Sequence, residues 1–304
     1  PMVVRLRDMF TLHETALLHL LRDELRTAGY EPYCGTMDDG YIWAPGDIPV
    51  MLVAHVDCIS RPETIFHDSE ADVFWSPDGL GADDRAGVWG ILHLVEKGYR
   101  PSILFTNGEE SGGWGARAAS RGLVHAIGDV RVLVEIDRCG AMEAVYYDCG
   151  SNALRDWTEK VGFKEHWGTF SDISILGPAW DIAAVNLSAG YYREHSPVEY
   201  LVVDDLMKTL VAVERLLQAP PLERWPHETE RSYRMDWYSA LSRNDNRDEL
   251  SHYWEYDEVE KREKGKGRVR AKVRVTRCWI TRLGSRRTAQ QRNGLTTRGT
   301  STTQ

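Results

Sequence analysis

Apolar residues recur at helical spacing near the start of the chain. Over residues 11–29 they form one stripe, made up of Leu12, Leu17, Leu18, Leu21 and Leu25. Polar residues occupy most positions between them, and glycine, here Gly29, is common just after the last residue of a helix. The pattern predicts an amphipathic helix that ends near Gly29.

Short apolar runs then alternate with helical patterns as far as residue 217. We expect strands at residues 41–43, 50–54, 103–106, 130–136, 144–147 and 182–187. We expect helices at residues 86–96, 152–161 and 202–217. This alternation is typical of the α/β class, here as three layers, α/β/α, around a central mixed, largely parallel sheet.

The pattern is lost after Gln218. Residues 219–260 contain prolines early, many charges and no clear period, whereas residues 261–304 hold 14 Lys and Arg and a single acid, Glu263. Because the whole chain has a net charge of -9, the part before residue 261 is strongly acidic. We therefore expect a folded domain over residues 1–218, an acidic irregular extension over 219–260 and a basic, disordered tail over 261–304.

Composition narrows the class of protein. A chain of 304 residues with 42% hydrophobic content can form a sizeable core. No apolar run approaches the roughly 18 residues of a membrane span, and the first residues lack a signal-peptide pattern. The five cysteines have no CxxC spacing, which argues against a disulfide framework or a thiolate zinc site. We expect a soluble, cytoplasmic protein without a membrane partner.

Several predicted strands and turns end in side chains that bind metals or transfer protons. They are His55 and Asp57 in AHVD, Asp83 and Asp84 in GADDRAG, Glu109 and Glu110 in NGEESG, Asp137 in EIDR, and His195 in EHSPVE. Taken singly, most of these motifs are as typical of a solvated loop or a helix N-cap. Together they suit a metal site at the carboxyl ends of the strands, in which one of two adjacent glutamates binds a cation and the other is a general base.

The joint occurrence of these five motifs, in this order, resembles the co-catalytic zinc exopeptidase superfamily. That superfamily includes bacterial aminopeptidases, tripeptidases and related deacylases, and the resemblance covers about residues 12–218. The folded domain over residues 1–218 would then be the catalytic domain. It implies that His55 and Asp137 bind one zinc ion and that Glu110 and His195 bind the other. Asp83 would bridge the two ions.

The same resemblance implies the remaining roles. Family members with a DDxxG loop use the aspartate four residues before the glycine, here Asp83 before Gly87, although Asp84 stays an alternative bridge. Glu109 matches the general base, and Asp57 matches the residue that supports the first histidine. Two zinc ions would lower the pKa of a water molecule and polarise the scissile carbonyl, and Co or Mn is an alternative to Zn.

Two spacings favour a compact core. Only 28 residues separate His55 from Asp83, and only 58 separate Asp137 from His195, too few for the domains that some members insert there. Three residues just before His195 are Tyr191, Tyr192 and Arg193. They either contact substrate or pack within the core.

The resemblance implies a di-zinc hydrolase that cleaves a peptide bond near a chain terminus, as an aminopeptidase does. An N-acyl amino acid deacylase or a carboxypeptidase would use the same ligands, so the substrate is either a peptide or an acylated amino acid. A third alternative is an inactive binding protein of this fold, in which the basic tail, residues 261–304, binds nucleic acid. The oligomeric state is left open.

Overall fold

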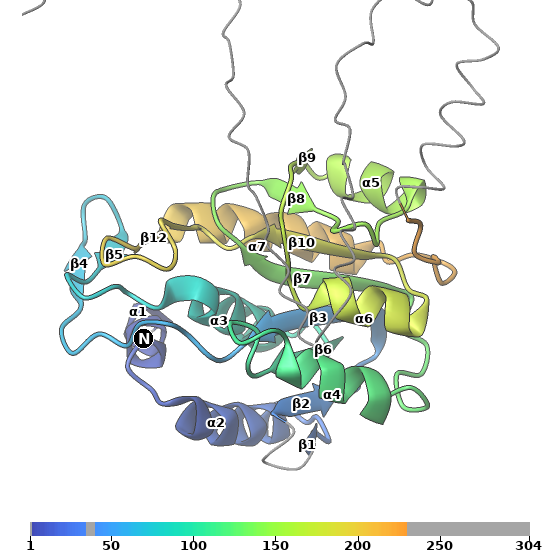
Figure 1. The fold of residues 1–304 in the computed structure, drawn as a ribbon, viewed down its shortest axis with the longest axis horizontal. Helices are drawn as coiled ribbons and strands as arrows, with labels where there is room; N and C mark the ends of the chain where they lie inside the picture. Colours follow the sequence, from blue (N-terminus) through green and yellow to red (C-terminus); the bar gives the residue numbers. More distant parts are fainter. Residues whose placement is uncertain (1, 35–39, 230–304) are drawn as a thin grey trace, which may run out of the picture. The chain divides into compact units, whose positions relative to one another are not determined.

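The computed structural model describes residues 2–34 and 40–229, with side chains from Leu6 onward. Their centre is an eight-stranded sheet in the order β1-β2-β6-β3-β7-β10-β8-β9 (Figure 1). The strands are β1 (Tyr33–Cys34), β2 (Tyr41–Ala44), β3 (Ile48–His55), β6 (Pro101–Thr106), β7 (Val132–Arg138), β8 (Glu143–Val145), β9 (Lys164–Glu165) and β10 (Ala184–Ser188). β3 pairs in parallel with β6 and β7, and β7 pairs in parallel with β10. β2 and β8 join antiparallel on either side, so the sheet is mixed and largely parallel, as predicted.

The parallel strands are buried on both faces, which explains their nearly continuous apolar sequences. In β3, Val50, Leu52 and Ala54 belong to one hydrophobic core, whereas Met51 and Val53 belong to the other. The first core includes residues of α1 (Met2–Met9), α2 (Glu14–Thr27), α3 (Ala82–Glu96), α5 (Asn152–Glu159) and α7 (Val203–Gln218). The second includes residues of α4 (Trp114–Gly122) and α6 (Ile173–Trp180). The three-layer α/β/α prediction is confirmed.

A second, smaller sheet was not predicted. Its strands, in the order β11-β12-β5-β4, are antiparallel and span Tyr191–Tyr192, Tyr200–Val202, Val73–Trp75 and Phe66–Asp68. Strands of two or three residues are too short to show a period in the sequence. Pairing of β12 with β5 brings the segment before α3 beside the segment after β10. The first of these segments leads into Asp83 in α3, and the second carries His195.

The predicted helices are present with shifted ends. The helix expected at residues 11–29 is α2, whose Leu17, Leu21 and Leu25 are fully buried. α3 begins at Ala82, four residues before the expected start, with a kink in its first turn. α6 was not predicted, because its sequence ISILGPAW is almost entirely apolar and shows no amphipathic stripe. No helix among the described residues has the length and apolar character needed to cross a bilayer.

The first residues after α7 lie against the ends of two central strands. The N–H of Ala183 donates to the carbonyl of Trp225 at 2.8 Å, and the N–H of Trp225 donates to the carbonyl of Arg131 at 3.1 Å. The N–H of Glu228 donates to the carbonyl of Gly150 at 2.7 Å. The extension predicted for residues 219–260 thus begins in contact with the domain. Its remainder after residue 229, and the tail predicted for 261–304, lie outside the described residues.

Candidate metal centre

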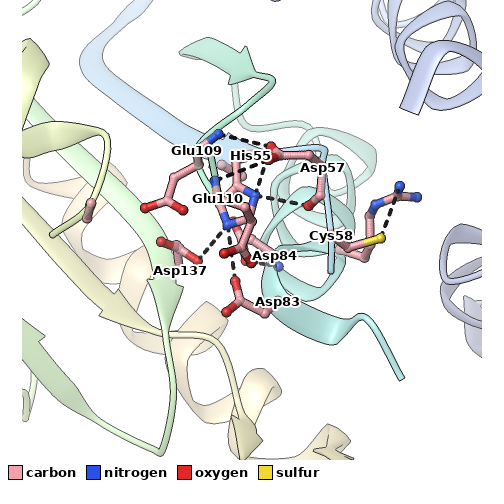
Figure 2. Close-up of polar contacts among 12 residues, drawn as sticks. His55, Asp57, Cys58, Asp83, Asp84, Glu109, Glu110 and Asp137 are labelled. Carbon is pink, nitrogen blue, oxygen red and sulfur yellow. Dashed lines mark hydrogen bonds and ion pairs between the residues drawn. The ribbon is translucent and has the colours of Figure 1, made fainter. Parts of the chain in front are cut away.

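The candidate ligands of the five motifs meet at the carboxyl ends of the parallel strands. His55 is the last residue of β3, Asp137 is the penultimate residue of β7, and Glu110 lies in the loop after β6. Asp83 lies in the kinked first turn of α3. Figure 2 shows the side chains of His55, Asp83 and Asp137 turned toward one another, although they come from three different elements.

One group of possible ligands consists of His55, Asp83 and Asp137. The Nε2 atom of His55 lies 3.1 Å from Oδ1 of Asp83 and 3.3 Å from Oδ1 of Asp137. One donor atom from each residue lies within 4.8 Å of the other two. The imidazole of His55 is 1% exposed, so this group lies beneath the protein surface.

A second group consists of Asp83, Glu110 and His195. The Nε2 atom of His195 lies 3.1 Å from Oδ2 of Asp83 and 2.9 Å from Oε1 of Glu110. Asp83 thus presents Oδ1 to His55 and Oδ2 to His195. Its neighbour Asp84 is fully buried, accepts a hydrogen bond from the N–H of Gly87 and belongs to neither group.

Glu109 lies close to both groups. Donor atoms of His55, Glu109 and Glu110 also lie within 4.8 Å of one another. The geometry therefore allows Glu109 either to bind a cation or to act beside one. Burial and then the charge of Asp137 raise the pKa of Glu109 to about 9.

Asp57 fixes the loop that carries both glutamates. Its Oδ1 accepts hydrogen bonds from the N–H groups of Gly108 at 2.7 Å and Glu109 at 3.2 Å, and its Oδ2 accepts one from Glu110 at 3.2 Å. The Nδ1 atom of His55 lies 3.3 Å from the same Oδ1. Burial raises the pKa of Asp57, but the contact with His55 and these N–H groups outweigh it, so the pKa is lowered. One carboxylate thus orients the first histidine and the glutamate loop.

The carboxylates in the cluster outnumber the imidazoles, so without a cation their negative charges are not balanced. Burial and the nearby Asp83 raise the pKa of Asp137 to about 7, against the effect of His55. The contact with Asp83 raises the pKa of His195 to about 9, although burial opposes it. Both shifts reflect several carboxylates held close together with only two imidazoles between them.

Buried oxygen atoms without hydrogen-bond partners lie in and beside the cluster. They are Oδ2 of Asp84, Oε1 of Glu135 and Oδ1 of Asp172. Leaving such acceptors unsatisfied is costly, and a nearby positive charge reduces that cost. The possible ligands offer nitrogen and oxygen but no sulfur, which is the donor set of catalytic zinc sites. The residues present therefore fit divalent cations.

No role was predicted for Glu199, whose carboxylate holds the backbone around Asp83. Its carboxylate is 2% exposed and accepts hydrogen bonds from the N–H groups of Gly81 at 2.6 Å, Ala82 at 2.9 Å and Asp83 at 3.1 Å. Glu199 is the last acid of the EHSPVE motif, so it could be identified as a candidate from the sequence. Its hydrogen bonds could not be predicted, because they join residues more than 110 positions apart.

Asp137 is likewise held by residues from the neighbouring β10 and β11. The N–H of Asp137 donates to Oδ1 of Asn186 at 2.8 Å, and the hydroxyl of Tyr191 donates to Oδ1 of Asp137 at 3.1 Å. Tyr191 is 2% exposed. The structure therefore favours packing against the site over contact with substrate for this residue. Tyr192 instead donates to Asp205 at 2.6 Å.

Comparison with solved structures finds similar folds among peptidases. A tripeptidase from Staphylococcus aureus matches with a TM-score of 0.59 and 12% identity, over 71% of this chain and 98% of that one. The aminopeptidase PepT from Bacillus cereus matches with a TM-score of 0.57 and 15% identity, over 71% and 97% of the two chains. The chain has the fold of the exopeptidases that its motifs resemble.

An archaeal protein supports the same assignment of the fold. The aminopeptidase APDkam598 from Desulfurococcus kamchatkensis matches with a TM-score of 0.51 and 13% identity, over 71% of this chain and 94% of that one. No family model and no curated protein sequence matches the chain. The likeness therefore concerns the fold, and the assignment of chemistry depends on the site.

Proposed function

We propose that the chain is a di-zinc metallopeptidase that removes residues from a peptide terminus as an aminopeptidase. The observation that carries the proposal is the carboxylate of Asp83, whose two oxygens face two separate histidines. His55 and Asp137 would hold one ion, Glu110 and His195 the other, and Asp83 both. Asp84 is the weaker candidate for the bridge, because Gly87 and not a second ligand group faces its Oδ1.

The protein's own residues would orient the reactants and move the proton. A bound pair of zinc ions would supply Lewis-acid polarisation of the scissile carbonyl and a more acidic water molecule. Glu109 would accept the proton of the attacking water and donate it to the leaving amine. Asp57, through the N–H groups of residues 108–110, would keep the carboxylate of Glu109 in place for both transfers.

The nature of the fold neighbours favours an aminopeptidase over a deacylase or carboxypeptidase. Two of the neighbours described above are named as aminopeptidases and the third as a tripeptidase. A substrate panel separates the alternatives, since each needs a different group beside the scissile amide: a free amine, an N-acyl group or a free carboxylate. The inactive-protein alternative predicts no turnover of any of them.

The experiment combines metal analysis with that panel. Purified protein, loaded with excess zinc and desalted, should retain about two ions per chain and hydrolyse free-amine peptides, and chelators should abolish the activity. A stoichiometry near zero would refute the metal site. Turnover confined to N-acylated amino acids or to C-terminal residues would replace the aminopeptidase with one of its alternatives.

A further inference from the structure

A cavity of about 560 Å³ lies at the edge of the central sheet, beside β8 and β9. It lies between the loop after β8, the segment that includes β9, and the first turns of α6. Its volume falls within the range of small-molecule sites in proteins. None of the roles proposed above uses it.

The wall of the cavity is linked to a proposed zinc ligand by a short chain of contacts. Tyr147 lines the cavity, and Nδ2 of Asn186 donates to its hydroxyl at 3.5 Å. The same Nδ2 lies 3.4 Å from Oδ2 of Asp137, and Oδ1 of Asn186 accepts the N–H of Asp137 at 2.8 Å. A single amide therefore separates the cavity wall from the metal centre.

A second wall of the cavity is formed by the start of α6. Ser174 lines the cavity from α6, two residues after Asp172. Asp172 is fully buried and accepts a hydrogen bond from the hydroxyl of Thr106 at the end of β6. The printed contacts therefore connect the cavity wall to Asp137, through Tyr147 and Asn186.

The lining of the cavity is aromatic and has a paired charge. Tyr146, Tyr147 and Trp167 contribute rings. The guanidinium of Arg155 lies 4.4 Å from the centre of the Tyr146 ring, and its Nε lies 3.1 Å from a carboxylate oxygen of Glu165. These two charges offset each other, so the charges of Arg155 and Glu165 are already paired; Asp148 and His166 also line the cavity.

Two features of the loop after β9 indicate a site for a ring. Trp167 lines the cavity and is 73% exposed, so its ring is accessible to a ligand, and aromatic side chains commonly line ligand pockets. The next residue, Gly168, packs directly on Tyr147: a Cβ atom there would lie 2.7 Å from Cε1 of the ring. The loop is therefore pressed against one wall of the cavity while Trp167 stays free to cover a ligand.

We propose that this cavity receives the aromatic side chain of the substrate's terminal residue, on the amino side of the scissile bond. The inference rests on the proposed aminopeptidase function, in which that terminal residue is present in every substrate. Phenylalanine, tyrosine or tryptophan at this position would stack between Trp167 and Tyr147. Acidic or basic side chains would find no unpaired partner in the Arg155 and Glu165 pair.

The kinetic test uses the zinc-loaded full chain and the dipeptides Phe-Ala, Ala-Phe and Ala-Ala. The protein should cleave Phe-Ala with the highest kcat/KM. Trp167→Ala should lower kcat/KM for Phe-Ala by about tenfold, the loss expected for one aromatic contact, and change that for Ala-Ala less than about twofold. Trp167→Phe should keep most of the wild-type kcat/KM for Phe-Ala. Tyr33→Ala, which removes an exposed aromatic residue at the opposite edge of the sheet, is the matched control and should change neither value.

A binding measurement separates failure of this inference from failure of the proposed function. Calorimetry with L-phenylalaninol and L-alaninol, which cannot be hydrolysed, should show that Trp167→Ala weakens only the aromatic ligand. If no dipeptide is cleaved but L-phenylalaninol binding still depends on Trp167, the peptidase proposal fails and the aromatic site stands. If dipeptides are cleaved but Trp167→Ala affects Phe-Ala and Ala-Ala equally and leaves L-phenylalaninol binding unchanged, the aromatic site is refuted and the peptidase stands.

Discussion

Glu109 and Glu110 are neighbours in the chain whose carboxylates have different surroundings. Oε1 of Glu110 lies 2.9 Å from His195, whereas Glu109 is 9% exposed and its pKa is raised to about 9 by burial and by Asp137. Positive charge in the centre would lower that pKa toward the range of a working base. The pair therefore offers one residue suited to hold an ion and one suited to transfer a proton.

Glu109→Gln should lower kcat by roughly 10² to 10⁴, the usual contribution of a general base, while both zinc ions stay bound. Glu110→Gln should instead release one ion, because an amide is a poor replacement for a carboxylate ligand. Metal content and turnover of the two variants check this assignment. Full activity of Glu109→Gln, or loss of metal from it alone, would shift the ligand role by one residue along the loop.

Glu199 acts on the centre through the backbone. Replacing its carboxylate with an amide removes the negative charge that holds the N–H groups of residues 81–83, so Asp83 should be less well positioned. Changes in residues that support metal ligands typically cost 10-fold to 100-fold in metal affinity. Zinc titration against a competing chelator should show this loss for Glu199→Gln and not for Glu63→Gln, a change at an exposed loop position. Unchanged affinity in Glu199→Gln would mean that the loop keeps its shape without that charge.

Among the elements, the inner strands of the central sheet could be predicted, because burial on both faces requires an apolar run that is visible in the sequence. The two-residue edge strands β1 and β9 were not predicted. β3 and β7 are examples, and each ends in a candidate ligand. The strands β5 and β12 could not be predicted, because three residues give no period and their pairing joins distant segments. The candidate ligands were named from motifs. The residues that position these ligands, such as Asn186 and Glu199, could not be predicted, because their contacts form only in the folded protein.

The contacts of the segment after α7 could not be predicted either, because its irregular sequence does not indicate that it packs on the sheet. Trp225 bridges the start of β7 and the start of β10 by two backbone hydrogen bonds, and its ring meets that of Trp157 edge-on, with centroids 5.8 Å apart. Arg131 also donates to the carbonyl of Pro221 at 2.8 Å. Residues 219–229 therefore belong to the folded domain in structure, whatever the role of the residues after them.

Shortening the chain should thus have two distinct outcomes. A chain that ends at Thr229 should keep the wild-type rate and Tm, since it retains these contacts. A chain that ends at Gln218 should unfold at a lower temperature, by roughly 5 to 10 °C, because it loses several hydrogen bonds worth about 1 kcal/mol each and the packing of Trp225. Thermal unfolding of both metal-loaded chains checks this, and equal Tm values would show that the segment adds nothing to stability.

At the scale of the whole molecule, charge is distributed unevenly along the chain and concentrated at one point within the fold. Residues 261–304 are strongly basic, so the nucleic-acid alternative predicts duplex binding that weakens with salt and disappears when the chain ends at Thr229. The candidate metal centre concentrates the opposite charge. Its carboxylates make the stability of the folded protein depend on both pH and metal.

The sign of that dependence follows from the pKa shifts. Without metal, the pKa of Glu109 rises from 4.5 to about 9 and that of Asp137 from 3.8 to about 7 on folding, so the folded state holds protons that the unfolded chain has released. The pKa of His195 rises from 6.5 to about 9, and the stabilisation from its charged form is lost as the pH rises through that value. All three shifts make the free energy of unfolding of the metal-free protein fall between about pH 5 and pH 9.

Zinc should reverse this trend, because it favours the deprotonated carboxylates and neutral histidines that high pH produces. The increase in Tm on zinc binding should therefore be larger at pH 8.5 than at pH 6, when chelator-treated and zinc-loaded protein are compared by thermal unfolding. Metal-free Glu109→Gln, which lacks the most strongly shifted of these carboxyls, is the matched control and should lose less Tm between the two pH values than metal-free wild type. A zinc-induced increase that is the same at both pH values, or a metal-free Tm that rises with pH, would show that these carboxylates are not held together as the structure places them.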